Sequence, residues 1–109
     1  MQKIQFSRNN ISKNSIENIK EIFKSGWLTH GKYTELFEKE FKKITKSKYA
    51  LTVSSCTAGL HLSCIAANFK KGDEVIVPAM SHTATSHAVE YTGAKVDFAD
   101  INLYSGNIS

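Results

Sequence analysis

Small hydroxyl-bearing residues interrupt an apolar stretch at positions 54–59, which read Ser-Ser-Cys-Thr-Ala-Gly. The preceding residues, 49–53, form an apolar run typical of a β-strand, and residues 57–69 have a composition that suits a helix. The cluster is therefore predicted to lie where a strand ends and a helix begins. The first N–H groups of a helix have no partner within the helix and carry the positive end of its dipole. Such a position can bind an anion, and phosphate is the usual one.

Two interpretations of this cluster stay open from the residues alone. In the first, Thr57 donates a hydroxyl to a phosphate, while the small residues Ala58 and Gly59 let its oxygens approach the backbone. In the second, the hydroxyl of Ser54, Ser55 or Thr57 only caps the helix, which is the commoner use of such residues.

A second cluster, Pro78–Thr85, occupies the equivalent place after the next predicted strand and carries hydroxyl groups with an imidazole. His82 could ligate a metal, act as a base, or stack its flat ring on a planar ligand. A metal site is not predicted. His82 and His87 are five residues apart rather than the four of a helical pair, and His61 and Cys64 lack a third ligand.

The elements that must position these residues fall into two predicted parts. Residues 1–48 should form an N-terminal arm at about 3–6 and two helices. The first helix runs from Ser12 or Ser15 to a terminating Gly26, and the second covers 33–45. Residues 49–109 should begin an α/β domain in β-α-β-α-β order, with short links and parallel strands. Its predicted elements are strands at 49–53, 74–77 and 95–99 and helices at 57–69 and 79–91.

Composition limits the classes of partner. The 109 residues are 41% hydrophobic and 22% charged, which is typical of a globular chain. The net charge is +4, but the lysine run at residues 39–48 is interleaved with Glu38 and Glu40 as on a solvated helix face, so no nucleic-acid partner is expected. No apolar run is long enough for a membrane span, and no membrane partner is expected. Two cysteines and the lack of a secretory signal predict a cytoplasmic location.

Four segments together resemble the N-terminal part of the DegT/DnrJ/StrS sugar aminotransferases, which are pyridoxal 5'-phosphate (PLP) enzymes of the aspartate-aminotransferase fold. The segments are SGWLTHGKYTELFEKEF (25–41), SSCTAGLHL (54–62), KKGDEVIVPAMSHTAT (70–85) and YTGAKVDFADI (91–101). The resemblance implies that the chain is the N-terminal part of the large PLP-binding domain of that fold.

The resemblance also implies roles for individual residues. Thr57, by its hydroxyl and N–H, and Ala58, by its N–H, would hold the cofactor phosphate. His82 would lie against the face of the pyridine ring.

The loop at residues 26–31 would lie near the substrate, with Trp27, Thr29 and Gly31 as contact residues. The family commonly has a proline after that glycine, where this chain has Lys32.

The family's Schiff-base lysine, and the aspartate that pairs with the pyridine nitrogen, lie far downstream of this segment. No lysine of this chain matches the lysine motif, so no catalytic residue is assigned here. The resemblance implies that the parent enzyme is a homodimer that transfers an amino group from an amino acid to a keto-sugar nucleotide, in amino-sugar or polysaccharide biosynthesis.

The 109 residues alone are expected to be an inactive N-terminal fragment. The alternative is a non-enzymatic small α/β module that binds a phosphorylated ligand, or a gene remnant.

Overall fold

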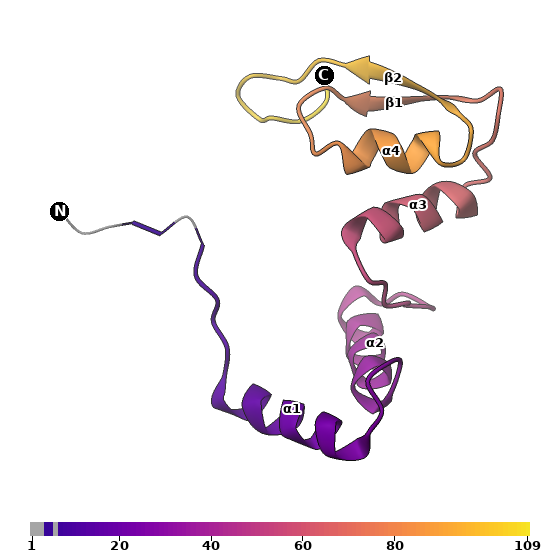
Figure 1. Cartoon of the computed structure of the whole chain (residues 1–109). Helices are drawn as coiled ribbons and strands as arrows, with labels where there is room; N and C mark the ends of the chain where they lie inside the picture. The colour runs from indigo at the N-terminus through magenta and orange to yellow at the C-terminus, as the bar shows by residue number, and fades with distance from the viewer. Residues whose placement is uncertain (1–3, 6) are drawn as a thin grey trace. The chain divides into compact units, whose positions relative to one another are not determined.

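The computed structural model describes residues 4, 5 and 7–109. Within them the elements follow the order α1, α2, α3, β1, α4, β2 (Figure 1). The chain divides into two compact units, Met1–Thr52 and Val53–Ser109, which are described separately below. Of the arm predicted at residues 3–6, residues 3 and 6 lie outside the described part, and residues 4 and 5 have no regular secondary structure.

The first unit contains the two predicted helices. Helix α1, Lys13–Ser25, begins where the Ser12 side chain accepts a hydrogen bond from the N–H of Ser15. It ends at Gly26, whose φ of 69° is a left-handed conformation that glycine adopts without strain. Helix α2, Lys32–Thr45, begins after Gly31. Both predicted helices are confirmed, and the predicted end of the first is correct.

Side-chain hydrogen bonds connect the elements of the first unit. The Tyr33 hydroxyl of α2 donates to Glu21 Oε2 of α1 at 2.8 Å. Further along α2, Glu38 Oε1 accepts hydrogen bonds from both the N–H and the hydroxyl of Thr52, each at 2.8 Å. The segment after α2 is therefore attached to that helix by a carboxylate.

The strand predicted at residues 49–53 does not form. These residues have no regular secondary structure, and the sheet found among the described residues contains only β1 and β2. A strand is stabilised by hydrogen bonds to a neighbour, whereas the Thr52 N–H donates to Glu38 instead. The apolar run indicated β propensity, but it could not indicate a pairing partner.

The second unit carries a parallel β-α-β arrangement. Helix α3, Cys56–Ala66, precedes strand β1, Glu74–Pro78, which is followed by helix α4, Ala84–Glu90, and strand β2, Lys95–Ala99. Strands β1 and β2 pair in parallel, with Val75 opposite Val96. The predicted α/β class and both of these strands are confirmed.

The two helices of this unit are shorter than predicted. Helix α3 ends at Ala66 rather than Phe69, since Asn68 turns into the left-handed region at φ 62°. Helix α4 begins at Ala84 rather than Ala79, because the residues after Pro78 form a loop.

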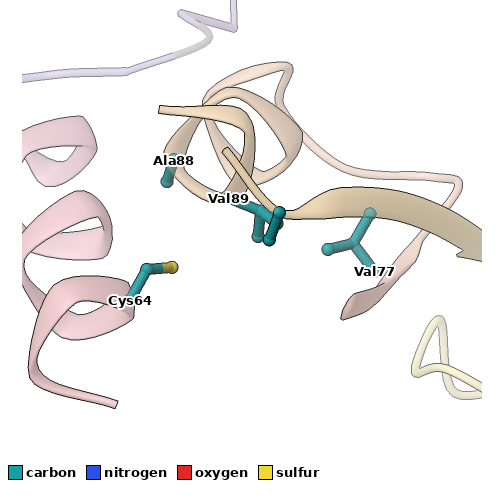
Figure 2. Packing of buried hydrophobic residues seen from close by; sticks show 5 residues of the cluster. Cys64, Val77, Ala88 and Val89 are labelled. Atoms are coloured by element: carbon teal, nitrogen blue, oxygen red, sulfur yellow. The ribbon is translucent and has the colours of Figure 1, made fainter. Parts of the chain in front are cut away.

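The core of the second unit lies between α3, α4 and one face of the sheet. It contains Cys64 of α3, Val77 of β1, Ala88 and Val89 of α4, and Ala94 (Figure 2). Ile76, which alternates with the buried Val77 along β1 and so points away from this core, has a 63% exposed side chain. Helix α4 thus anchors the β1–β2 pair and holds the loop that precedes it. Within the described part of the chain, no helix has the length and apolarity needed to cross a bilayer.

Candidate functional site

The start of α3 is capped by Ser55. Its Oγ accepts a hydrogen bond from the Ala58 N–H at 3.1 Å, and its carbonyl accepts one from the Gly59 N–H at 3.1 Å. The capping interpretation of the hydroxyl cluster is therefore correct for Ser55. It accounts for the Ala58 donor but leaves other donors of the first turn available.

Three donors remain at this helix start. Among the described residues, the N–H groups of Cys56 and Thr57 and the hydroxyl of Thr57 have no hydrogen-bond partner. The first turn of α3 contains no acidic residue. Two amide donors, one hydroxyl donor and the positive end of the helix dipole suit a phosphate monoester, and no local carboxylate repels it. The donor set thus fits the phosphate of PLP.

The loop between β1 and α4 holds His82 in a defined orientation. The Nδ1 atom of His82 accepts a hydrogen bond from the Ala84 N–H at 3.1 Å, in the place of the side-chain cap that Thr83 does not provide. Since Nδ1 is the acceptor, the proton of the neutral ring lies on Nε2. The side chain is exposed, so one ring face is accessible to a planar ligand.

The two helix starts of the second unit share one side. Helices α3 and α4 both begin on the side at which β1 and β2 end (Figure 1). In parallel α/β sheets, ligands bind beyond the carboxyl ends of the strands. Thr57, Ala58 and His82 therefore lie on the side of this unit where such a ligand is expected.

A cavity of about 610 Å³ in the first unit brings together the three predicted loop residues Trp27, Thr29 and Gly31. The indole Nε1–H of Trp27 donates to the His30 carbonyl at 2.7 Å. Helix α2 starts at Lys32, the first helical position, where proline is also favoured because no N–H is needed there. The change from the family's proline to Lys32 thus leaves the helix start in place.

Sequence reasoning missed Glu21 and Tyr33, which also line this cavity. The hydrogen bond from Tyr33 to the Glu21 carboxylate raises the pKa of Tyr33 above its ordinary value of 10.0. The pair is separated by 12 residues and joins two helices, so no local spacing could have indicated it.

Comparison with known proteins relates this arrangement to one family. The profile of the DegT/DnrJ/EryC1/StrS aminotransferase family matches residues 9–109. The chain belongs to this family. It is 40% identical over 98 residues to the spore coat polysaccharide biosynthesis protein SpsC of Bacillus subtilis. The aligned residues cover 90% of this chain and 25% of SpsC.

Solved structures of sugar-modifying proteins show the same fold as this family member. The PLP form of the putative sugar aminotransferase Spr1654 from Streptococcus pneumoniae matches with a TM-score of 0.89 and 31% identity, over 97% of this chain and 27% of that one. A GDP-4-keto-6-deoxymannose-3-dehydratase with a trapped PLP–glutamate geminal diamine matches with a TM-score of 0.89 and 32% identity. This match covers 98% of this chain and 29% of the dehydratase chain. The chain spans about a quarter of the length of the relatives it matches.

Proposed function

We propose that this chain forms the N-terminal, cofactor-phosphate-binding part of a PLP-dependent enzyme that aminates a keto-sugar nucleotide. The observation that carries the proposal is the set of available donors at the start of α3, in a chain that belongs to the aminotransferase family. When bound, PLP supplies an electron sink for bond breaking at the carbon that bears the amino group.

The residues of the second unit bind and orient the cofactor in this proposal. The Thr57 hydroxyl and N–H bind the phosphate oxygens, and the Ala58 N–H joins them when it leaves Ser55 Oγ. The dipole of α3 stabilises the phosphate charge. The His82 ring, held through Nδ1, packs against the pyridine face and fixes its plane. A fixed plane keeps the reacting bond aligned with the electron sink.

The residues of the first unit contact the substrate in this proposal. The Thr29 side chain lines the cavity and has no hydrogen-bond partner among the described residues, so its hydroxyl is available to a sugar hydroxyl or phosphate. Trp27 and Gly31 shape the wall beside it.

Activity requires parts that this sequence does not supply. The proposal assigns the cofactor-anchoring lysine and the partner of the pyridine nitrogen to a continuation of the chain, since the relatives are about four times as long. The 109 residues alone are then inactive. The complete enzyme is proposed to be a cytoplasmic homodimer, and the name of SpsC supports a role in polysaccharide biosynthesis.

The test starts from the gene product in its own cells. Its mass, by immunoblot or intact mass spectrometry, should be several times the 12.1 kDa of this chain. The purified product, with PLP and glutamate, should then convert a nucleotide-linked keto sugar into the amino sugar. A native product of 12.1 kDa, or no reaction with any keto-sugar nucleotide, would contradict the proposal.

A dehydratase is the second candidate function, because the dehydratase structure matches as well as the aminotransferase does. The same assay separates the two. An aminotransferase product gains nitrogen at the keto carbon, whereas a dehydratase product loses a hydroxyl and gains no nitrogen.

A further inference from the structure

Trp27 lines the cavity, and its hydrogen bonds are made to its own loop and to the end of α1. Its Nε1–H donates to the His30 carbonyl at 2.7 Å, and its backbone N–H donates to Ser25 Oγ at 3.2 Å. Ser25 Oγ in turn donates to the Ile22 carbonyl of α1 at 2.6 Å. Trp27 therefore connects the end of α1, through its backbone N–H, to the far end of the loop, through its indole.

The ring of Trp27 also packs closely against Gly31. A Cβ placed on Gly31 would lie 3.1 Å from Trp27 Cδ1, which is closer than ordinary van der Waals contact. The backbone of Gly31 is extended, with φ −149°, so any residue could adopt it. A side chain at position 31 would therefore have to shift the indole ring by a few tenths of an ångström, while the backbone conformation itself does not call for glycine.

The contacts of Trp27 with His30 and Gly31 hold Thr29, which lies between them in the loop. Thr29 lies within the loop that the Trp27–His30 hydrogen bond closes, and its hydroxyl has no partner among the described residues. We infer that Trp27 is a positioning residue, which fixes the Trp27–Gly31 loop so that Thr29 faces the substrate and which itself gives no hydrogen bond to the substrate. This inference rests on the proposed function for the identity of the ligand.

The test is a double-mutant cycle in the full-length gene product. Trp27→Phe keeps an aromatic ring and removes the indole donor, and Thr29→Val keeps the shape and removes the hydroxyl. Each single variant should raise KM for the keto-sugar nucleotide about fivefold, the effect of one hydrogen bond, with kcat within twofold of wild type. Because Trp27 acts through Thr29, the double variant should match Thr29→Val alone.

Gly31→Ala is the matched second perturbation, because the new methyl group must displace the ring. It should reproduce the KM rise of Trp27→Phe. Additive effects of Trp27→Phe and Thr29→Val would show that Trp27 contacts the substrate itself and would overturn the inference. An unchanged KM in any of the three single variants would overturn it as well.

A second readout does not depend on activity. Backbone order parameters of Thr29 and His30 should fall in Trp27→Phe, and unchanged values would overturn the inference even if the enzyme is active. A wild-type protein that converts no keto-sugar nucleotide, but loses loop order in Trp27→Phe, would contradict the proposed function and leave the positioning role of Trp27 supported.

Discussion

Two acceptors compete for one backbone N–H at the start of α3. The Ala58 N–H already donates to Ser55 Oγ, and the proposed phosphate would need the same donor. A single N–H cannot give a full hydrogen bond to both. At the residue scale, capping and phosphate binding are therefore alternatives at Ala58, while the donors of Thr57 are available to the phosphate in either case.

This competition predicts whether the replacement of Ser55 strengthens or weakens PLP binding. Ser55→Ala should lower the stability of the full-length protein without cofactor by about 1 kcal/mol, because a helix cap is lost. The same variant should bind PLP more tightly relative to pyridoxal, which lacks the phosphate, by up to about fivefold. Absorbance titrations with both compounds measure this ratio.

The matched control is Ser54→Ala, which removes a neighbouring hydroxyl that has no hydrogen bond among the described residues. It should leave the ratio unchanged. A selective loss of PLP affinity in Ser55→Ala would show that Ser55 donates to the phosphate and would contradict the competition.

The Glu38–Thr52 contact acts at the scale of elements, since it attaches the segment after α2 to that helix. Hydrogen bonds from the N–H and then the hydroxyl of Thr52 lower the pKa of Glu38 below its ordinary value of 4.5. A carboxylate with a lowered pKa stabilises the folded state fully above its ordinary pKa, and this contribution is lost as the pH falls through the lowered value. The attachment should therefore persist near pH 4.5 and be released only in more acidic solution.

The amide resonance of Thr52 measures this release directly by NMR. It should titrate with the lowered pKa of Glu38 in the unmodified protein and lose that titration in Glu38→Gln. Glu40→Gln is the control, because Glu40 lies on the same helix but pairs with Lys43. A Thr52 resonance that titrates in the same way in Glu38→Gln would exclude the contact.

Residue patterns predicted those elements that are stabilised by contacts between residues close together in the chain. The end of α1 at Gly26 could be predicted, and so could its start to within two candidate caps, Ser12 and Ser15, because each signal lies beside the helix end that it specifies. The β1–α4–β2 unit could be predicted because its parts are adjacent in the chain. The irregular structure of residues 49–53 and the hydrogen bond between Tyr33 and Glu21 could not be predicted. Each depends on a partner distant in the chain, which no local spacing specifies.

The same limit applies to the candidate site. The hydroxyl cluster at residues 54–59 indicated a helix start, but not which hydroxyl caps it, because Ser54, Ser55 and Thr57 are chemically alike. The proposed role of Trp27 depends on the path of its own loop, and the family resemblance implied only a substrate contact for this residue.

At the scale of the whole molecule, many large apolar side chains remain exposed. Phe98 is 63% exposed and Trp27 is 61% exposed, and no large side chain of the described part is fully buried. Among the described strands, β1 and β2 pair only with each other, and parallel strands with open edges favour association with other segments.

The isolated 109 residues are therefore predicted to be marginally stable or to aggregate. Their thermal unfolding should be broad, and they should bind a hydrophobic dye strongly, because the apolar surface is accessible. Circular dichroism and size-exclusion chromatography check this. A sharp transition from a monomeric species would contradict it.

Thr57 is the residue through which we propose that α3 binds the phosphate of PLP. The most direct measurement is the ratio of PLP to pyridoxal affinity in the full-length protein and in its Thr57→Val variant, which keeps the shape and loses the hydroxyl. We predict a strong preference for PLP in the unmodified protein and a loss of about 10- to 100-fold in that preference in Thr57→Val, as for one hydrogen bond to a charged group. Equal affinities for PLP and pyridoxal, or a preference that Thr57→Val leaves intact, would contradict the claim.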